Sequence, residues 1–184
     1  MHNGKLILGI DTSTSILDIA VIDGVGNILA SVVSDNEKTH SERALPAVDN
    51  VLKKANLSIN DIDIFAACIG PGSYTGVRIG VSIAKGLALA AGKTYKTISS
   101  FDLMAHGKSG LIIPIIDARR GAVFACGYQD GKQILKPQRI DLEELKSKFI
   151  NQDYTLIEPH SNKWQGITPN MLGNDDIIYL GGSV

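Results

Sequence analysis

Cysteine and net charge are both scarce in this sequence. Its 184 residues include two cysteines, Cys68 and Cys126, which lie far apart and belong to no Cys-x-x-Cys motif. Two such cysteines cannot form the disulfide framework of a small secreted domain, so we expect a reducing, cytoplasmic environment. The formal net charge is −1. A protein that binds nucleic acid alone needs an excess of positive charge for phosphate contacts, so that function is disfavoured.

Long uncharged hydrophobic runs are also missing. The most apolar long stretch, Val77 to Ala91, contains Arg78 and Lys85, and charges in so short a run argue against a membrane span. The N-terminal apolar run is cut short by Asp11, which is typical of neither a signal peptide nor a transit peptide. We therefore expect a soluble protein that contacts no membrane.

Familiar catalytic and metal-binding motifs are absent as well. The two Gly-Lys-Ser/Thr triplets, at Gly92 and Gly107, lack the glycine five residues earlier that a P-loop requires. Neither Ser73 nor Ser82 has both flanking glycines of a nucleophile elbow. The four histidines are isolated, so they form no zinc motif. Nothing local favours a P-loop NTPase, a serine hydrolase or a metalloenzyme.

The sequence does contain a regular succession of short apolar segments. Continuous apolar runs bounded by turn residues predict strands, and apolar residues at three- and four-residue spacing predict helices. Three strands joined by short turns come first, and helices then alternate with strands in the order βββαβαβα. Thr39 and Glu42 fit a capping box, but Pro46 would then lie deep in the first helix, so that helix either starts near Arg43 or bends there. The predicted strands span residues 6–10, 17–22, 28–33, 64–69 and 95–98, and the predicted helices 44–55, 74–91 and 101–106.

A second set of segments follows the flexible Gly107 to Gly110 stretch, which marks a plausible boundary. We predict an N-terminal lobe of residues 1–107 and a smaller, incomplete C-terminal lobe of residues 108–184. After Pro159 no periodicity is sustained until residues 177–180. The predicted elements of this part are strands at 111–116, 122–128 and 154–157, and a helix at 142–150.

The glycine-rich segment at residues 70–80 carries the most information. It leaves a buried strand and enters a helix, where glycines allow close backbone approach and a helix N-terminus can hold a phosphate. Its third glycine is one residue late for the dinucleotide fingerprint. A structural turn, a partner-binding loop and a small-nucleotide site all remain open interpretations.

Two further features have both a structural and a functional interpretation. Small residues recur every four positions along the helix at 74–91, from Gly76 to Gly92, and let another backbone approach closely. That backbone belongs either to the chain's own sheet or to another subunit. The Asp11-Thr12-Ser13-Thr14 segment, between two strands, is either a polar turn or a place where a carboxylate and hydroxyls hold a metal-bound phosphate.

The strand order and the Asp-Thr-Ser turn resemble the actin-like ATPase fold. Four strings, ILGIDTST, THSERALPAV, CIGPGSYTGVRIGVSIAKGLALA and IDARRGAVF, resemble one family in it, the TsaB (YeaZ) family, over about residues 5–128. The resemblance implies an α/β fold of the actin-like (ASKHA, ribonuclease H-like) class, with a βββαβαβα lobe and an abbreviated second lobe. Residues 129–184 carry little recognisable pattern.

The resemblance also implies a function. TsaB proteins are partners of TsaD in forming N6-threonylcarbamoyladenosine at position 37 of tRNA, so it implies a non-catalytic scaffold. The chain would pair with a TsaD-type paralogue through its first two long helices, form a homodimer through a similar surface when alone, join a TsaE-type ATPase in a larger complex, and meet tRNA only through that complex. It would bind no cofactor alone, with ATP and metal on the partner.

The same resemblance assigns two sets of residues. The partner interface would contain Leu45, Val48, Leu52, Gly76, Val77, Gly80, Val81, Ala84 and Ala88. The family-motif loops would contain Asp11, Thr12, Ser13, His40, Ser41, Gly70, Pro71, Gly72, Ser73, Thr75, Gly76, Arg78, Asp117 and Arg119.

Two departures from catalytic relatives support a non-catalytic chain. The catalytic paralogue carries an H-x-x-x-H metal motif after the fifth strand, where this chain has Ser100 and Met104. ATP-using relatives place a glycine two residues after the aspartate, where this chain has Ser13. The alternative is an independent metallopeptidase-like or ATP-hydrolysing enzyme of the same fold.

Overall fold

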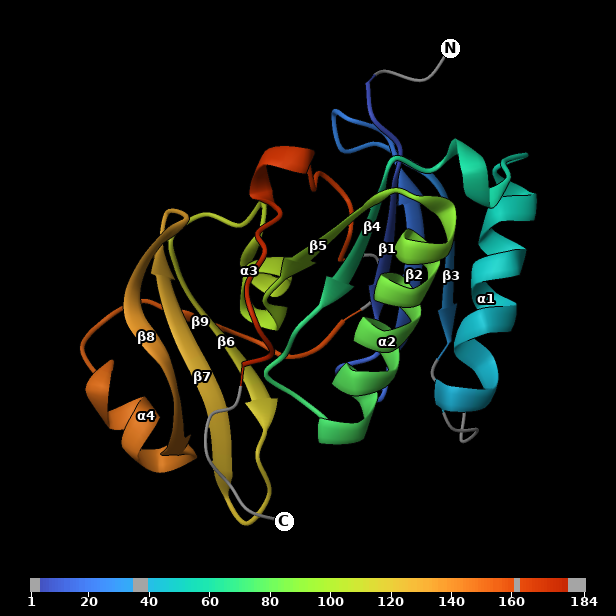
Figure 1. The fold of residues 1–184 in the computed structure, drawn as a ribbon. Helices are drawn as coiled ribbons and strands as arrows, with labels where there is room; N and C mark the ends of the chain where they lie inside the picture. Colours follow the sequence, from blue (N-terminus) through green and yellow to red (C-terminus); the bar gives the residue numbers. More distant parts are fainter. Residues whose placement is uncertain (1–3, 35–39, 161–162, 179–184) are drawn as a thin grey trace.

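The computed structural model describes residues 4–34, 40–160 and 163–178. Its strands fall into two sheets, and most of its helices cover their faces (Figure 1). The first part of the chain forms β1 (Ile7–Asp11), β2 (Leu17–Ile22), β3 (Ile28–Ser34), α1 (His40–Lys54), η1 (Ile59–Asp61), β4 (Ile64–Cys68), α2 (Tyr74–Ala91), β5 (Thr94–Ile98) and α3 (Ser100–Ala105). The rest forms β6 (Leu111–Asp117), β7 (Ala122–Gln129), β8 (Lys132–Asp141), α4 (Leu142–Lys148), β9 (Thr155–Ile157) and η2 (Pro169–Met171).

The first sheet has the strand order β3-β2-β1-β4-β5. The first three strands pair antiparallel, whereas β4 pairs parallel with β1 and with β5. Every residue of β1, β2 and β4 is buried, as continuous apolar runs predict for strands covered on both faces. The predicted βββαβαβα order is therefore confirmed.

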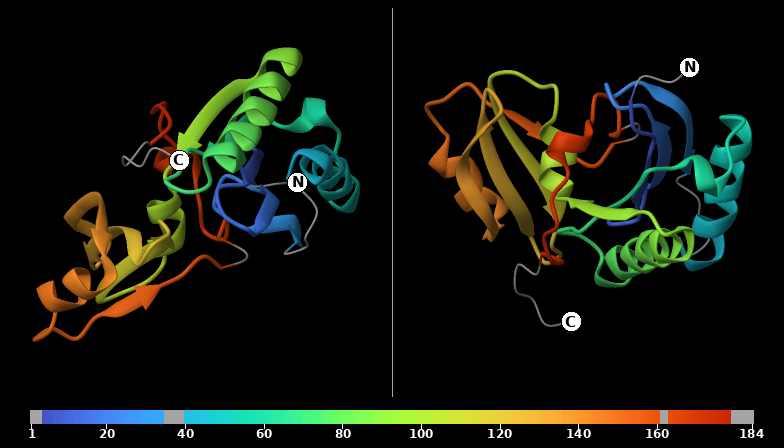
Figure 2. Two further views of the ribbon diagram at one scale, coloured as in Figure 1. Left: turned by 90° about the horizontal axis from the view of Figure 1, so that it is seen from below. Right: turned by 45° about the horizontal axis from the view of Figure 1, so that its top comes forward.

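Alternate side chains of the first sheet enter two different cores. One core holds Leu8 and Ile10 of β1 together with the apolar faces of α1 and α2. The other holds Ile7 of β1 with α3 and with residues from far along the chain, including Trp164. Figures 1 and 2 show the C-terminal segment, in orange to red, running from the second sheet to the first.

The second sheet has the order β8-β7-β6-β9, with β6 and β9 parallel and the other pairs antiparallel. Helix α4 covers one face of it, where Leu145 and Phe149 are buried. Helix α3 covers the other face through Phe101 and Met104, while Leu103 enters the first sheet's core. Helix α3 therefore joins the two sheets.

The boundaries of the elements differ from prediction in a few places. Helix α2 has the predicted bounds, but α1 begins at His40, well before the predicted residue 44. Pro46 lies inside α1 on its exposed side, so the carbonyl group that loses a hydrogen bond can be solvated. Strand β8 was not predicted, because its alternation of apolar and polar residues is weak.

The chain's last described segment follows the second sheet in sequence but packs on the first. Residues 163–173 pack on the first sheet, and a bridge between Thr97 and Gly173 adds to that contact. The division at residue 107 stays a prediction, and the predicted pattern at 177–180 lies partly outside the described residues. Among the residues that the structure describes, no helix is long and apolar enough to cross a membrane.

Candidate functional site

The polar turn after β1 is the first candidate site, and both oxygens of its carboxylate are bonded. Asp11 ends β1 and is fully buried. Its Oδ1 accepts a hydrogen bond of 2.8 Å from the backbone N–H of Ser13, and its Oδ2 forms an ion pair with the Lys163 ammonium. Lys163 is itself 4% exposed. A buried ion pair therefore occupies the carboxylate that the sequence singled out.

A second carboxyl group lies next to this pair. Asp18 is directly opposite Asp11 in the antiparallel pairing of β1 and β2, and it is fully buried. Its Oδ2 accepts a hydrogen bond of 3.0 Å from the backbone N–H of Lys163. The indole N–H of Trp164 lies 3.2 Å from the Asp18 carbonyl oxygen and donates to it. Two strands and a distant segment thus meet at one polar cluster.

The cluster shifts the pKa values of its members. Burial alone would raise the pKa of the Asp11 carboxyl, but Lys163 and the hydrogen bonds from Ser13 hold that pKa below its ordinary value. Burial alone would lower the pKa of Lys163, but the negative charge of Asp11 raises it. Burial raises the pKa of the neighbouring Cys68 thiol to about 12. At neutral pH the turn holds a charged pair beside a protonated, unreactive thiol.

The glycine-rich loop packs directly against this turn. The Ser73 N–H donates to the Ser13 carbonyl oxygen at 2.7 Å, and a Cβ on Gly72 would collide with that oxygen. The Ser100 hydroxyl lies 2.8 Å from the Pro71 carbonyl oxygen and 3.0 Å from the Ser13 hydroxyl. The loop and the turn therefore bind each other at the start of α2.

These contacts do not suit a metal-bound nucleotide phosphate, the group that the actin-like fold implies at this turn. Such a group needs free N–H donors at the helix start and a carboxylate open to the metal. Here the N–H groups of Ser73 and Gly76 are already bonded, the latter to the Ser73 hydroxyl at 3.2 Å. The Asp11 carboxylate is bonded to Lys163. The residues present therefore do not fit the group.

The row of small residues on α2 faces the chain's own sheet. A Cβ on Gly76 would collide with the Thr12 carbonyl oxygen, and one on Gly80 would lie 2.5 Å from the Thr12 hydroxyl oxygen. That hydroxyl donates to the Gly76 carbonyl oxygen at 2.6 Å. Of the two interpretations of this row, packing within the chain is the one the structure shows.

Most of the predicted interface set does not form an exposed surface of this chain, and its contact with a partner stays a prediction. Seven of the nine residues are buried within the chain, because the apolar stripe of each helix is the stripe that fills its own core. The seven are Val48, Leu52, Gly76, Val77, Gly80, Ala84 and Ala88. Val81 is partly exposed, and Leu45 is 52% exposed.

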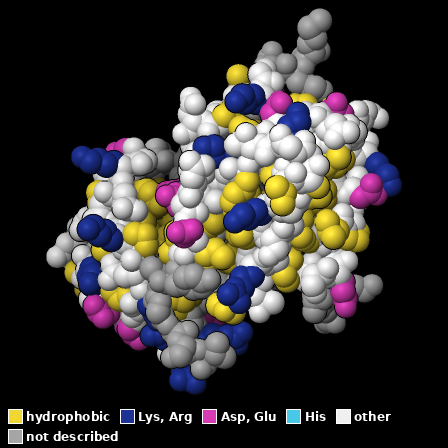
Figure 3. Space-filling view, viewed as in Figure 1, with side chains coloured by type: hydrophobic (Ala, Val, Ile, Leu, Met, Phe, Trp, Pro, Cys, Tyr) yellow, Lys and Arg dark blue, Asp and Glu magenta, His cyan; other side chains and the backbone are white. Residues whose placement is uncertain are grey.

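A shallow groove between α1 and α2 offers a different surface on the same two helices. Its volume is about 450 Å³. Its apolar side chains include Leu45 and Tyr74, which is 53% exposed, and the Arg78 guanidinium lies 4.5 Å from the centre of the Tyr74 ring. Figure 3 shows hydrophobic side chains gathered over these helices. The groove residues are Ser41, Leu45, Tyr74, Thr75, Arg78, Ile79, Ser82 and Ile83.

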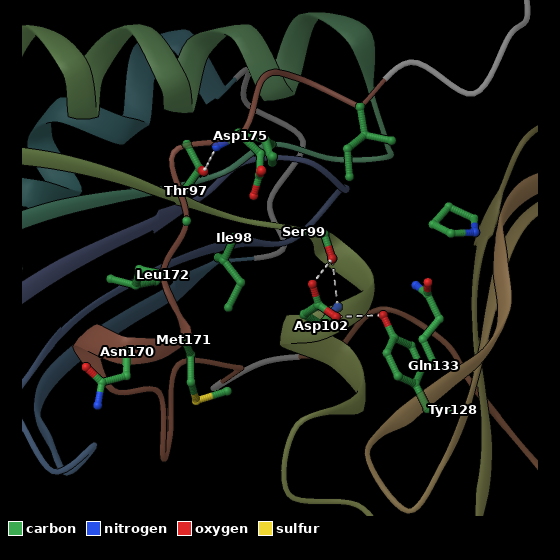
Figure 4. Close-up of a pocket in the computed structure, with 14 residues that line it drawn as sticks. Thr97, Ile98, Ser99, Asp102, Tyr128, Gln133, Asn170, Met171, Leu172 and Asp175 are labelled. Atoms are coloured by element: carbon green, nitrogen blue, oxygen red, sulfur yellow. Dashed lines mark hydrogen bonds between the residues drawn. The ribbon is translucent and has the colours of Figure 1, made fainter.

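A second cavity, of about 490 Å³, lies where α3, β5, β7 and β8 approach one another. In Figure 4, Asp102 stands between Ser99 and Tyr128, whose hydroxyl groups donate to it at 2.6 Å and 2.7 Å. Burial and the neighbouring Asp102 raise the pKa of Tyr128, so its hydroxyl stays protonated and can donate. The bond from Tyr128 ties α3 to the second sheet, whereas the bond from Ser99 lies within the start of α3 itself.

The structure brings together some of the predicted motif residues and separates others. The Asp11 turn, the loop at residues 70–76 and the start of α1 meet, and His40 Nε2 lies 2.6 Å from the Thr14 carbonyl oxygen. Asp117 and Arg119 lie instead in the exposed hairpin between β6 and β7 of the second sheet.

The sequence reasoning missed Asp18, Lys163 and Trp164. One signal was available for Asp18, a charged residue inside an otherwise apolar strand. Another was that Trp164 is the single tryptophan, since a large aromatic residue seldom lies unburied in a loop. Nothing in the local sequence identifies Lys163 as the partner of Asp11, because 152 positions separate them.

The comparisons with known sequences agree with one another. A family model described as "TsaD: tRNA N6-adenosine threonylcarbamoyltransferase" matches residues 27–149. A Bacillus subtilis (strain 168) protein named "tRNA threonylcarbamoyladenosine biosynthesis protein TsaB" is 39% identical over 166 residues, covering 82% of this chain and 72% of the relative. An Escherichia coli (strain K12) protein of the same name is 34% identical over 162 residues, covering 78% and 69%.

The comparison with solved structures gives the same fold. YeaZ from Pseudomonas aeruginosa matches with a TM-score of 0.72 and 26% identity, covering 83% of this chain and 75% of that one. An uncharacterized protein described as similar to the peptidase YeaZ from Pseudomonas aeruginosa matches with a TM-score of 0.76 and 20% identity, covering 96% and 100%. The predicted actin-like α/β fold is confirmed.

Proposed function

This chain belongs to the TsaB (YeaZ) family, and we propose that it acts as the non-catalytic partner of a TsaD-type paralogue in forming N6-threonylcarbamoyladenosine at position 37 of tRNA. The observation that carries the proposal is that the sequence is similar both to TsaB proteins and to the TsaD family model. Its relatives are named as threonylcarbamoyladenosine biosynthesis proteins, while the family model that matches two thirds of the chain is that of the transferase TsaD.

The geometry of the polar turn supports a non-catalytic role. The Asp11 carboxylate is bonded to Lys163, and the Ser73 and Gly76 N–H groups at the start of α2 are bonded within the chain. Ser100 and Met104, at the positions of the paralogue's histidines, are both buried in the core. In this proposal ATP and the metal bind to the partner, and the rival metallopeptidase or ATPase function is not favoured.

The groove between α1 and α2 is the proposed contact surface for the partner. The TsaD family model spans both helices, so a TsaD-type paralogue carries a corresponding helix pair. Two proteins of the same fold can pair through equivalent faces, as in a two-fold homodimer. Tyr74 and Arg78 are of the types that dominate such interfaces, and Leu45 lines the same groove. The same face forms the proposed homodimer when the chain is alone.

Further components of the proposal concern the larger assembly. A TsaE-type ATPase joins the pair in the cytoplasm, and tRNA contacts this chain only as part of the complex. A net charge of −1 supports that arrangement, because the phosphate contacts must then come from other subunits.

A matched pair of substitutions tests the contact surface. Leu45→Glu places a charge in the groove, and we expect it to weaken binding of the cognate TsaD-type protein by at least thirtyfold, about 2 kcal/mol, which is typical of a central interface residue. Ile134→Glu is the control, because Ile134 is 51% exposed, almost as much as Leu45, but lies in β8 of the second sheet. The measurement is the dissociation constant by calorimetry.

Two outcomes would contradict the proposal. Equal affinities of the Leu45→Glu and Ile134→Glu variants for the TsaD-type protein would show that the groove is not part of the interface. Normal levels of the tRNA modification in cells that lack this chain would contradict the proposed function. Native mass spectrometry of the unmodified chain and its partner, separately and mixed, measures the stoichiometry directly.

A further inference from the structure

Two carboxyl groups lie buried side by side at the end of β1. Asp11 and Asp18 are cross-strand partners, and both are 0% exposed. Cross-strand partners share one face of a sheet, and here it is the face that packs against Trp164 rather than against α1 and α2. Burying one carboxylate without a counter-charge is costly, and burying two next to each other is more so.

The structure shows how this cluster obtains a positive charge. The Lys163 ammonium binds Asp11, and the backbone N–H of Lys163 binds Asp18. Both contacts come from one residue that lies more than 140 positions farther along the chain. Among the residues that the structure describes, Lys163 alone forms an ion pair with Asp11.

The lysine is held there by the packing of its neighbours. Trp164 is fully buried and lies so close to Gly9 of β1 that a Cβ on Gly9 would collide with the indole ring. The Gly166 N–H donates to the Gly26 carbonyl oxygen at 2.7 Å. The ammonium is therefore positioned by a fixed segment and not by a mobile side chain alone.

We propose that Lys163 is a tethered cation that takes the place of a metal ion at this turn. Its ammonium supplies the positive charge that the buried Asp11 and Asp18 carboxyl groups require, so the first lobe folds with neither metal nor nucleotide bound. The same contact closes the turn to a metal-bound phosphate. This inference concerns the chain alone and does not depend on the proposed partner.

Removing the ammonium should convert the turn into a site that responds to divalent cations. We expect Lys163→Ala to lower the melting temperature by roughly 10 °C, because it leaves a buried carboxylate unpaired. Magnesium or manganese chloride should then restore about 3–6 °C at a concentration tenfold above the dissociation constant. The measurement is thermal unfolding by circular dichroism, with ionic strength held constant by sodium chloride.

Two controls make the response specific. The unmodified chain should show no change in melting temperature with either salt, because its site already holds a cation. The double variant Lys163→Ala/Asp11→Asn should show none either, because the carboxylate that would bind the ion is gone. A gain equal to that of Lys163→Ala in either control, or no gain in Lys163→Ala, overturns the proposal.

A measurement on the unmodified chain covers the case in which Lys163→Ala does not fold under any condition. An amine-reactive ester followed by peptide mass spectrometry reports the accessibility of each lysine. We expect Lys163 to react at least tenfold more slowly than the exposed Lys132 and Lys136, because it is buried and paired. Equal rates would show that the ammonium does not occupy the site and would overturn the proposal.

Discussion

At the scale of single residues, the role of Asp11 depends more on the group it pairs with than on its own residue type. A carboxylate after the first strand is compatible with phosphate binding, but the ion pair with Lys163 gives it a structural task instead. Thr12 shows the same effect on the other face of the sheet, where its hydroxyl donates to the Gly76 carbonyl oxygen of α2. Neighbouring residues of one turn thus anchor two different layers of the molecule.

The Asp11–Lys163 pair predicts a particular dependence of stability on pH. The folded-state pKa of Asp11 lies below its ordinary value of 3.8, so its contribution is complete above about pH 4. That contribution is lost as the pH falls through the folded-state pKa. The folded-state pKa of Lys163 lies above its ordinary value of 10.5, so its contribution is complete below about pH 10 and is lost above it.

Denaturant unfolding between pH 2 and pH 7 measures this effect. The double variant Lys163→Met/Asp11→Asn removes both charges while keeping similar side-chain volumes, so the free energy of unfolding should fall less steeply below pH 4 than in the unmodified chain. Asp18 and Cys68 face the same cluster and are unchanged in both proteins. Identical acid slopes would show that the pair contributes nothing to acid stability.

At the scale of elements, α2 shows why glycines on one helix are not equivalent. Gly76 and Gly80 face Thr12, directly after the end of β1, whereas Gly86 faces open space. Glycine in a helix is destabilising unless a close approach requires it. The buried row lets α2 pack against the turn after β1, and the groove between α1 and α2 lies on the helix's other side.

Two glycine substitutions on α2 should change the free energy of unfolding in opposite directions. Gly80→Ala places a Cβ 2.5 Å from the Thr12 hydroxyl oxygen, which must move and weaken its bond to Gly76, so we expect a loss of roughly 1–3 kcal/mol. Gly86→Ala meets no atom within 4 Å, so its higher helix propensity should stabilise the chain by about 0.5–1 kcal/mol. Urea unfolding of both variants measures the difference, and a loss of stability in both would contradict this assignment of the two faces.

At the scale of the whole molecule, one core of the first sheet is completed by residues from the far end of the described chain. The core between β1, β2, β4 and α3 also contains Trp164, Ile167 and Leu172. Their contacts with β1 span more than 140 positions, whereas the signals that predict the order of strands and helices lie within a few residues of one another. The chain therefore runs from the first sheet to the second and back again.

A substitution at Trp164 should affect the first lobe as a whole. Trp164→Ala empties a fully buried position and removes the indole donor to Asp18, so we expect a loss of roughly 3–5 kcal/mol. Trp164→Phe should lose less, because the ring that covers Gly9 is largely kept. Far-ultraviolet circular dichroism during urea unfolding measures both. A loss below 1 kcal/mol for Trp164→Ala would show that this segment is not part of the core.

Much of the first lobe could be predicted because its signals are local. The continuous apolar runs at β1, β2 and β4, the turns between the first strands and the small-residue row of α2 each lie within a few residues of one another. Strand β8 was missed because half of it alternates only weakly. The sequence did not separate core residues from interface residues on α1 and α2, because an amphipathic stripe identifies the buried side of a helix and does not distinguish the chain's own core from a partner.

The sequence by itself determined the βββαβαβα order, the position of the glycine-rich loop at the start of α2 and the family to which the chain belongs. The tertiary structure was needed to show that the small residues of α2 face inward, that a groove between α1 and α2 is exposed, and that Lys163 closes the Asp11 turn. The physical reason is the distance along the chain over which each interaction acts. Periodicity and turn chemistry act over a few residues, whereas the pairing of a buried charge depends on which distant segment the folded chain brings to it.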